Sequence, residues 1–144
     1  MVVDSSMAAA WFLPDEQNEL ADRLMARLGR APGRVPSLFW FETRNLFLIA
    51  ERRGRLKSGD AAFSMAQLRN LSLEDAGSGS DRLVLDLATK HRLTGYDASY
   101  LALAAHEGRA LATLDRKLAQ AARLEKVELL GPLRSEIEEM KGEP

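Results

Sequence analysis

The fold is decided by residues 109–130, which read RALATLDRKLAQAARLEKVELL. Two apolar runs in this stretch, residues 109–114 and 126–130, have the length and composition of short buried strands. The residues between them, Arg116 to Leu124, carry a helical pattern. A helix that connects two strands in this way is typical of a βαβ unit, whose strands are parallel. We therefore predict a parallel sheet that is covered by helices.

The rest of the chain repeats this alternation. Further strands are predicted at residues 2–3, 34–36 and 71–73, and helices at residues 7–12, 15–28, 38–53, 59–70, 81–92 and 97–107. The recurrence of Leu20, Leu24 and Leu28 every four residues supports the second of these helices. Strands that alternate with helices predict an α/β protein with helices on both faces of the sheet.

The chain has the length of one ordinary domain. Its 144 residues are 46% hydrophobic, which is enough for a core of its own. Gly131-Pro132 breaks the last strand, and the residues that follow are strongly charged. We expect a single domain over residues 1–132 and a charged C-terminal tail over residues 133–144.

The overall charge excludes some classes of protein. A net charge of −1 means that any nucleic-acid-binding surface must be a local patch. The absence of cysteine excludes disulfides, thiolate metal sites and cysteine nucleophiles. No run of apolar residues has the length of a membrane span, and the first residues lack the pattern of a signal peptide. We expect a cytoplasmic protein without a membrane partner.

Four acidic residues stand at places where a carboxylate is informative. Asp4 follows the first predicted strand, and Asp115 follows the strand at 109–114. Asp97 opens a predicted helix, and Glu42 lies in the apolar helical stretch LFWFETRNL, residues 38–46. Ligands of parallel α/β sheets bind beyond the carboxyl ends of the strands, where the strand order reverses. If the fold gathers these carboxylates there, they could hold Mg²⁺ or Mn²⁺ against a phosphodiester.

Each of these acidic residues also has a purely structural interpretation. Asp4 and Asp115 could serve only as helix N-caps, and Thr94-x-x-Asp97 matches a capping box. A carboxylate at Glu42, among aromatic neighbours, needs a partner. Arg44 or Arg53 could supply it. These interpretations remain open at the level of sequence.

Three polar residues lie beside the acidic positions. The hydroxyls of Ser6 and Thr113 are each two positions from an aspartate and could hold a metal-bound water or a phosphate oxygen. Asn45 shares a helical face with Glu42 and could orient it. His91 and His106 are expected to be solvated, because nothing near them has the spacing of metal ligands.

Four motifs together resemble a PIN domain. They are VVDSS at residues 2–6 with Trp11-Phe12, PSLFWFETRN at 36–45, LTGYDASYLALA at 93–104 and ATLDRKL at 112–118. In this order they are similar to the VapC toxins of bacterial toxin–antitoxin pairs. The resemblance covers residues 1 to about 130. It implies a three-layer α/β/α sandwich with a short central parallel sheet, and an Mg²⁺- or Mn²⁺-dependent endoribonuclease.

The resemblance also assigns roles to individual residues. It implies that Asp4, Asp97 and Asp115 are metal ligands and that Glu42 is catalytic, with Ser6, Asn45 and Thr113 in supporting positions. Some relatives carry a further acidic residue after the last aspartate. Arg116 and Lys117 stand there in this chain, so a second metal site is in doubt.

Other interpretations remain possible. A PIN-like module could bind RNA or protein without cutting, although such a module gains nothing from an uncompensated acidic cluster. A phosphotransfer enzyme of the haloacid-dehalogenase type would need Asp-x-Asp, and Ser6 occupies the second aspartate position. The sequence does not identify the RNA.

The resemblance further implies an antitoxin partner and a toxin homodimer. Trp11, Phe12 and Leu13 could form part of the antitoxin surface, or they could be ordinary core residues. The basic run Arg52-Arg53-Gly54-Arg55-Leu56-Lys57 could follow an RNA backbone or could be a solvated helix end.

Overall fold

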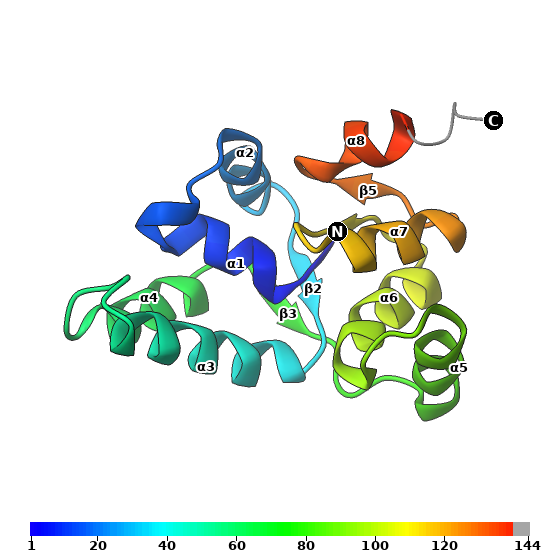
Figure 1. The fold of residues 1–144 in the computed structure, drawn as a ribbon, viewed down its shortest axis with the longest axis horizontal. Helices are drawn as coiled ribbons and strands as arrows, with labels where there is room; N and C mark the ends of the chain where they lie inside the picture. The colour runs from blue at the N-terminus through cyan, green and yellow to red at the C-terminus, as the bar shows by residue number, and fades with distance from the viewer. Residues whose placement is uncertain (140–144) are drawn as a thin grey trace.

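The computed structural model describes residues 1–139 and shows a parallel sheet between two layers of helices (Figure 1). The strands are β1 (Val2–Val3), β2 (Gly33–Val35), β3 (Leu73–Asp75), β4 (Leu111–Ala112) and β5 (Leu129–Leu130). Their order in the sheet is β3-β2-β1-β4-β5, and all four pairings are parallel. The predicted α/β sandwich with a short central parallel sheet is therefore confirmed.

Helices connect the strands. They are α1 (Ser5–Phe12), the 3₁₀ turn η1 (Pro14–Glu16), α2 (Glu19–Arg27), α3 (Leu38–Arg52), α4 (Asp60–Arg69), α5 (Asp81–His91), α6 (Gly95–Glu107), α7 (Arg116–Leu124) and α8 (Leu133–Glu139). Side-chain oxygens of Asn18, Ser80 and Thr94 accept from backbone N–H groups at the starts of α2, α5 and α6. These caps satisfy donors that a helix start leaves unpaired.

The sheet is short, but it lies at the centre of the core. Val2 and Val3 of β1 and Leu111 and Ala112 of β4 are fully buried. This burial on both faces is typical of parallel strands covered by helices on each side. The core extends into α3 and α6 through large aromatic side chains such as Phe39, Phe47 and Tyr100.

The helix predicted over residues 15–28 is interrupted, which corrects the sequence prediction. Pro14 begins the separate turn η1, and α2 begins only at Glu19, where Asn18 is the cap. Leu24 and Leu28 are buried, but Leu20 is 46% exposed. The four-residue recurrence of leucine was therefore misleading at its first position.

Two strands are shifted relative to their predicted bounds. β2 begins at Gly33, which the sequence pattern placed in a turn, and β3 covers 73–75 rather than 71–73. A β-carbon at Gly33 would lie 2.9 Å from Cδ2 of both Leu28 and Leu73, so the glycine permits β2 to pass close to its neighbours. Gly33 therefore has a packing role within the sheet, whereas the sequence pattern indicates only a turn.

The C-terminal segment contains helix α8 within the stretch expected to be a charged tail. Leu133 and Ile137 of α8 are buried in the common core, and Arg116 of α7 bonds to Glu136. The remainder of that expected tail, residues 140–144, lies outside the described residues. The helix therefore contributes apolar contacts beyond residue 132.

Two expectations about basic side chains are also resolved. His106 is exposed as expected, but the His91 side chain is only 7% exposed and its Nε2 lies 2.9 Å from Oε2 of Glu125. In the basic run, Arg55 forms a salt bridge with Asp15 and another with Glu16 of η1. Arg55 therefore connects the segment that follows α3 to η1.

Candidate active site

Asp4 and Asp115 lie at the point where the strand order reverses. The chain passes from β1 to β2 and β3 on one side of the sheet and then returns to β4 and β5 on the other side. Asp4 directly follows β1, and Asp115 follows β4 after two intervening residues. Because β1 and β4 are paired in parallel, the two aspartates come together at the carboxyl edge of the sheet.

Asp4 is held by hydroxyl groups from two parts of the chain. The Ser6 hydroxyl donates to Oδ1 at 2.6 Å, and the Thr113 hydroxyl donates to Oδ2 at 2.6 Å. The backbone N–H of Met7 also donates to Oδ1, at 3.2 Å. Both oxygens of this carboxylate are therefore fixed in direction by donors of the protein.

The Asp4 carboxyl group is 4% exposed and is costly to ionise. Burial raises its pKa to about 6, and the negative charge of Asp115 adds to this rise. The hydrogen bonds from Ser6, Thr113 and Met7 act in the opposite direction, because they stabilise the charged form. Asp4 thus changes its charge near neutral pH, unlike an ordinary surface aspartate.

Asp115 is both a helix N-cap and a member of the acidic group, the two interpretations that the sequence left open. Its Oδ1 accepts from the N–H of Leu118 at 3.0 Å, so it is the N-cap of α7. Its own N–H donates to the hydroxyl of Thr113 at 2.9 Å, the same hydroxyl that holds Asp4. The cap therefore also places the Asp115 carboxylate beside Asp4.

Asp97 lies in the first turn of α6 and is half-buried. Its N–H donates to the Thr94 hydroxyl at 3.0 Å, as the capping-box pattern predicts. Burial raises the pKa of Asp97, and the charge of Asp115 raises it further. The Thr94 hydrogen bond and the positive charge of Lys117 lower it. Asp97 is therefore electrostatically connected to the pair at the strand ends.

The Glu42 carboxylate has a hydrogen-bond partner that the sequence did not indicate. The Tyr100 hydroxyl of α6 donates to Glu42 Oε1 at 2.5 Å, whereas Arg44 lies with its guanidinium 5.0 Å from the centre of the Phe41 ring. Burial raises the pKa of Glu42, and the negative charge of Asp97 raises it further, while the Tyr100 bond lowers it. The suggested pairing with Arg44 or Arg53 is not found among residues 1–139, and a hydrogen bond from a tyrosine takes its place.

Tyr100 is a site residue that the sequence analysis missed. It is 1% exposed, and burial together with the Glu42 carboxylate raises the pKa of its hydroxyl. A signal was present in the sequence, because Tyr100 follows Asp97 by three residues on the same helix and a buried tyrosine hydroxyl usually needs a partner. The identity of that partner depends on the tertiary structure, which brings Glu42 of α3 to Tyr100 of α6.

The four carboxylates form a series rather than a compact cluster. Asp4 is affected by Asp115, Asp97 by Asp115, and Glu42 by Asp97. Within residues 1–139, no three Asp, Glu, His or Cys side chains are close enough together to form a metal-binding group. The chemistry of the donors nevertheless fits Mg²⁺ or Mn²⁺, since all are oxygens and several are carboxylates with raised pKa.

The supporting residues divide into two groups. Ser6 and Thr113 both contact Asp4 directly, as expected for supporting positions. Asn45 is exposed on α3, and the described part of the chain shows no side-chain hydrogen bond between it and Glu42. Direct hydrogen bonds therefore join four of the seven candidate residues, namely Asp4, Ser6, Thr113 and Asp115.

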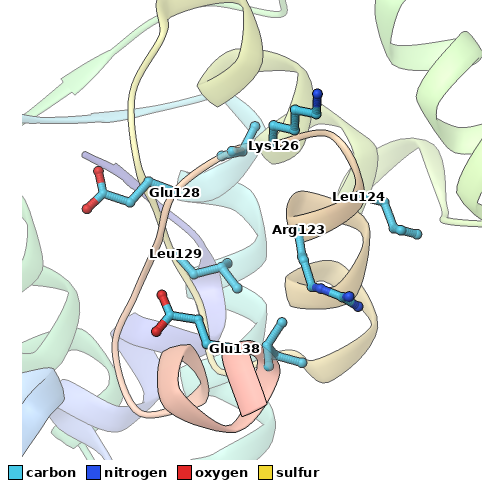
Figure 2. Close-up of a pocket in the computed structure, with 8 residues that line it drawn as sticks. Arg123, Leu124, Lys126, Glu128, Leu129 and Glu138 are labelled. Atoms are coloured by element: carbon cyan, nitrogen blue, oxygen red, sulfur yellow. The ribbon is translucent and has the colours of Figure 1, made fainter. Parts of the chain in front are cut away.

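A separate cavity lies away from these residues, between α7, β5 and α8 (Figure 2). Its volume is about 570 Å³, and its lining includes two basic and two acidic side chains, those of Arg123, Lys126, Glu128 and Glu138. None of the candidate site residues lines it. We therefore place the candidate active site at the carboxyl edge of β1 and β4 and not in this cavity.

This arrangement agrees with a known class of protein. The chain belongs to the PIN domain family, whose family model matches residues 1–124. The chain is 33% identical over 123 residues to Ribonuclease VapC3 from Pyrobaculum aerophilum, with 83% of this chain and 92% of that protein covered. The resemblance to VapC-type PIN domains that the motifs suggested is thus confirmed.

A solved structure supports the fold independently. The crystal structure of PAE2754 from Pyrobaculum aerophilum superposes with a TM-score of 0.71 and 23% identity, and it covers 96% of this chain and 88% of its own. At this identity the likeness concerns the fold. Among residues 1–139, no helix has the length and apolar character needed to cross a membrane.

Proposed function

We propose that the protein is a VapC-type endoribonuclease that depends on Mg²⁺ or Mn²⁺ and cleaves RNA phosphodiester bonds with an activated water. The observation that carries this proposal is the buried Asp4 carboxyl group at the reversal of strand order, coupled by charge to Asp115. A fold with no use for a cation would gain stability by replacing this group. The similarity to a protein named as a ribonuclease supports the same function.

In this proposal Asp4, Asp97 and Asp115 hold the metal ion. A divalent ion supplies a water of lowered pKa and a Lewis acid for the phosphate. Ser6 and Thr113 keep the Asp4 oxygens in a fixed direction, so that little reorientation is needed on binding. Glu42, held by Tyr100, lies on the α3 side of Asp97 and is suited to orient the water.

A second candidate is a PIN-like module that binds RNA or protein without cutting it. The observation that favours it is the absence of a three-residue metal-binding group among the described residues. The presence of all four carboxylates, three of them with raised pKa, supports the nuclease instead. A binding module has no reason to retain that electrostatic cost.

Cleavage assays with matched variants separate the two functions. Wild-type protein should cleave a mixed RNA pool with Mg²⁺ or Mn²⁺ and not with EDTA. Asp4→Asn and Asp97→Asn should each abolish cleavage, because asparagine keeps the cap and the shape but loses the charge. Asp86→Asn, an exposed residue of α5, is the control and should keep full activity. Full activity of either site variant, with an intact fold by circular dichroism, would disprove the assignment.

The partners follow from the same proposal. The VapC type implies a cognate antitoxin, and we propose that one of its basic side chains lies between Asp4, Asp97 and Asp115 in the complex. A toxin homodimer and a cytoplasmic location are also proposed. Expression of the protein alone should arrest growth, and co-expression with the antitoxin encoded beside it should restore growth. Growth arrest that survives loss of cleavage would argue against RNA as the cellular target.

A further inference from the structure

Tyr96 is an exposed aromatic residue next in sequence to Asp97 of the candidate site. It is the second residue of α6, directly before Asp97, and it is 68% exposed. Other large apolar side chains of the described chain are also exposed, such as Phe63 on α4. Tyr96 and Phe63 are similarly exposed, but Tyr96 is next in sequence to Asp97 of the candidate site, whereas Phe63 lies on α4.

The helix places Tyr96 on the same face as Tyr100. Residues four apart on a helix lie one above the other, with side chains inclined toward the helix start. Tyr100 is buried and donates to Glu42 of α3. Tyr96 therefore lies one turn closer to the start of α6, on the side of the helix that carries Tyr100, and Asp97 directly follows it.

A basic residue lies close to Asp115 in the sequence, on another helix. Lys117 lies in the first turn of α7, two residues after Asp115, and it is exposed. Its helix packs against α6, the helix that carries Asp97. The neighbouring Arg116 is engaged with Glu136 of α8, whereas no salt bridge of Lys117 is found among residues 1–139.

We propose that Tyr96 is a base-stacking platform for the RNA and that Lys117 contacts a phosphate of the same strand. The inference rests on the proposed ribonuclease function and names the residues that hold its substrate. An exposed tyrosine ring can stack on any unpaired base, and a lysine ammonium offsets part of the repulsion between RNA and the carboxylates. Together they would position the strand across Asp97 from the α6 side to the α7 side.

Binding measured without cleavage tests this inference separately from catalysis. The probe is a single-stranded RNA of about 12 nucleotides with 2-aminopurine at several positions, in EDTA and low salt. Tyr96→Ala should weaken binding by at least about fivefold and should reduce the quenching of 2-aminopurine that stacking produces. Tyr96→Phe keeps the ring and should retain both. Phe63→Ala is the matched control with an equally exposed aromatic and should change neither.

The salt dependence of affinity tests Lys117 in a different way. For single-stranded RNA, loss of one phosphate contact should reduce the slope of log K against log salt by about 0.7. Lys117→Gln should show this change, while Lys126→Gln, an exposed lysine beyond the carboxyl end of α7, should not. Tyr96→Ala should keep the wild-type slope, because stacking releases no counterion.

The outcomes distinguish the two hypotheses. If wild type cleaves RNA but Tyr96→Ala binds and is quenched like wild type, the stacking role is wrong and the nuclease stands. If Tyr96→Ala instead changes the oligomeric state in size-exclusion chromatography and leaves RNA affinity unchanged, the ring belongs to a protein interface. If Tyr96→Ala loses RNA binding while wild type shows no cleavage with either metal, the stacking role stands and the nuclease assignment fails.

Discussion

The Tyr100 hydroxyl donates a hydrogen bond of 2.5 Å to Glu42, 58 positions earlier in the chain, and so joins α6 to α3. Glu42 is the last member of the carboxylate series that begins at Asp4. The hydrogen bond fixes the direction of Glu42 Oε1 and favours the charged form of the carboxylate, in opposition to burial. The bond therefore connects stability with the proposed chemistry.

Tyr100→Phe should weaken both properties. Loss of a partly buried hydrogen bond to a charged group is expected to cost about 1.5–3 kcal/mol in the free energy of unfolding. RNA cleavage should also fall, since Glu42 would lose its orientation and its pKa would rise. Tyr96→Phe, an exposed hydroxyl on the same helix, is the control and should leave stability unchanged. Urea unfolding and cleavage rates measure the two effects.

A double-mutant cycle with Glu42→Gln isolates this interaction. If Tyr100 acts through Glu42, the tyrosine substitution should cost much less activity in the Glu42→Gln background than in wild type. Additive effects would mean that Tyr100 contributes through core packing alone.

The stability of the metal-free protein should depend on pH through Asp4. Its pKa is about 6 in the folded state and 3.8 in an ordinary setting, so the folded state binds the proton more tightly than the unfolded state. Stability from this group is therefore present below pH 3.8 and is lost as pH rises through 6. The full cost is on the order of 3 kcal/mol above pH 6.

Comparison with Asp4→Asn isolates this contribution. In EDTA, the variant should be more stable than wild type at pH 7.5, and the advantage should shrink as the pH falls through 6 toward 4. Glu42 and Asp97 also have raised pKa values, but they are present in both proteins and largely cancel. A difference in unfolding free energy that stays constant over this range would show that Asp4 does not titrate as described.

Metal binding should stabilise the protein by relieving repulsion among the carboxylates. At a concentration of Mg²⁺ or Mn²⁺ 100 times its dissociation constant, the gain is about 2.7 kcal/mol. For a domain of about 150 residues, this corresponds to a rise in melting temperature of roughly 5–10 °C. Asp97→Asn should melt higher than wild type without metal and respond less to metal. An equal response in both proteins would place the metal elsewhere.

Trp11→Ala should destabilise the fold rather than act only on a partner. The Trp11 side chain is buried between α1 and α2, 7% exposed, and its Nε1 donates to the carbonyl oxygen of Ala21 at 2.7 Å. Replacement of a buried tryptophan by alanine typically costs about 3–5 kcal/mol. Leu20→Ala, an exposed position on α2, is the control and should have little effect in thermal unfolding.

This prediction decides between the two roles that the sequence left open for Trp11. An anchor for the antitoxin would be replaceable without loss of stability, but with a loss of affinity of tenfold or more. A stable Trp11→Ala variant with weakened antitoxin binding would therefore contradict the core position described above.

The sequence by itself determined the sheet class and the position of the acidic residues along the chain. Local patterns were sufficient for this, because strand–helix alternation implies parallel strands and Asp4 and Asp115 stand directly after them. The cap interpretation of Asp4, Asp97 and Asp115 was equally local, and the structure shows that capping and membership of the site coexist. The predicted roles of these residues in catalysis remain predictions.

Only the tertiary structure decided which residues the acidic groups meet. The Thr113 bond to Asp4 joins positions 109 residues apart, and the Tyr100 bond to Glu42 joins positions 58 residues apart on two different helices. The same holds for the burial of Trp11 and for the pairing of His91 with Glu125. Such contacts depend on how helices pack around the sheet, and this packing is set by the whole core rather than by the neighbours of any one residue in the chain.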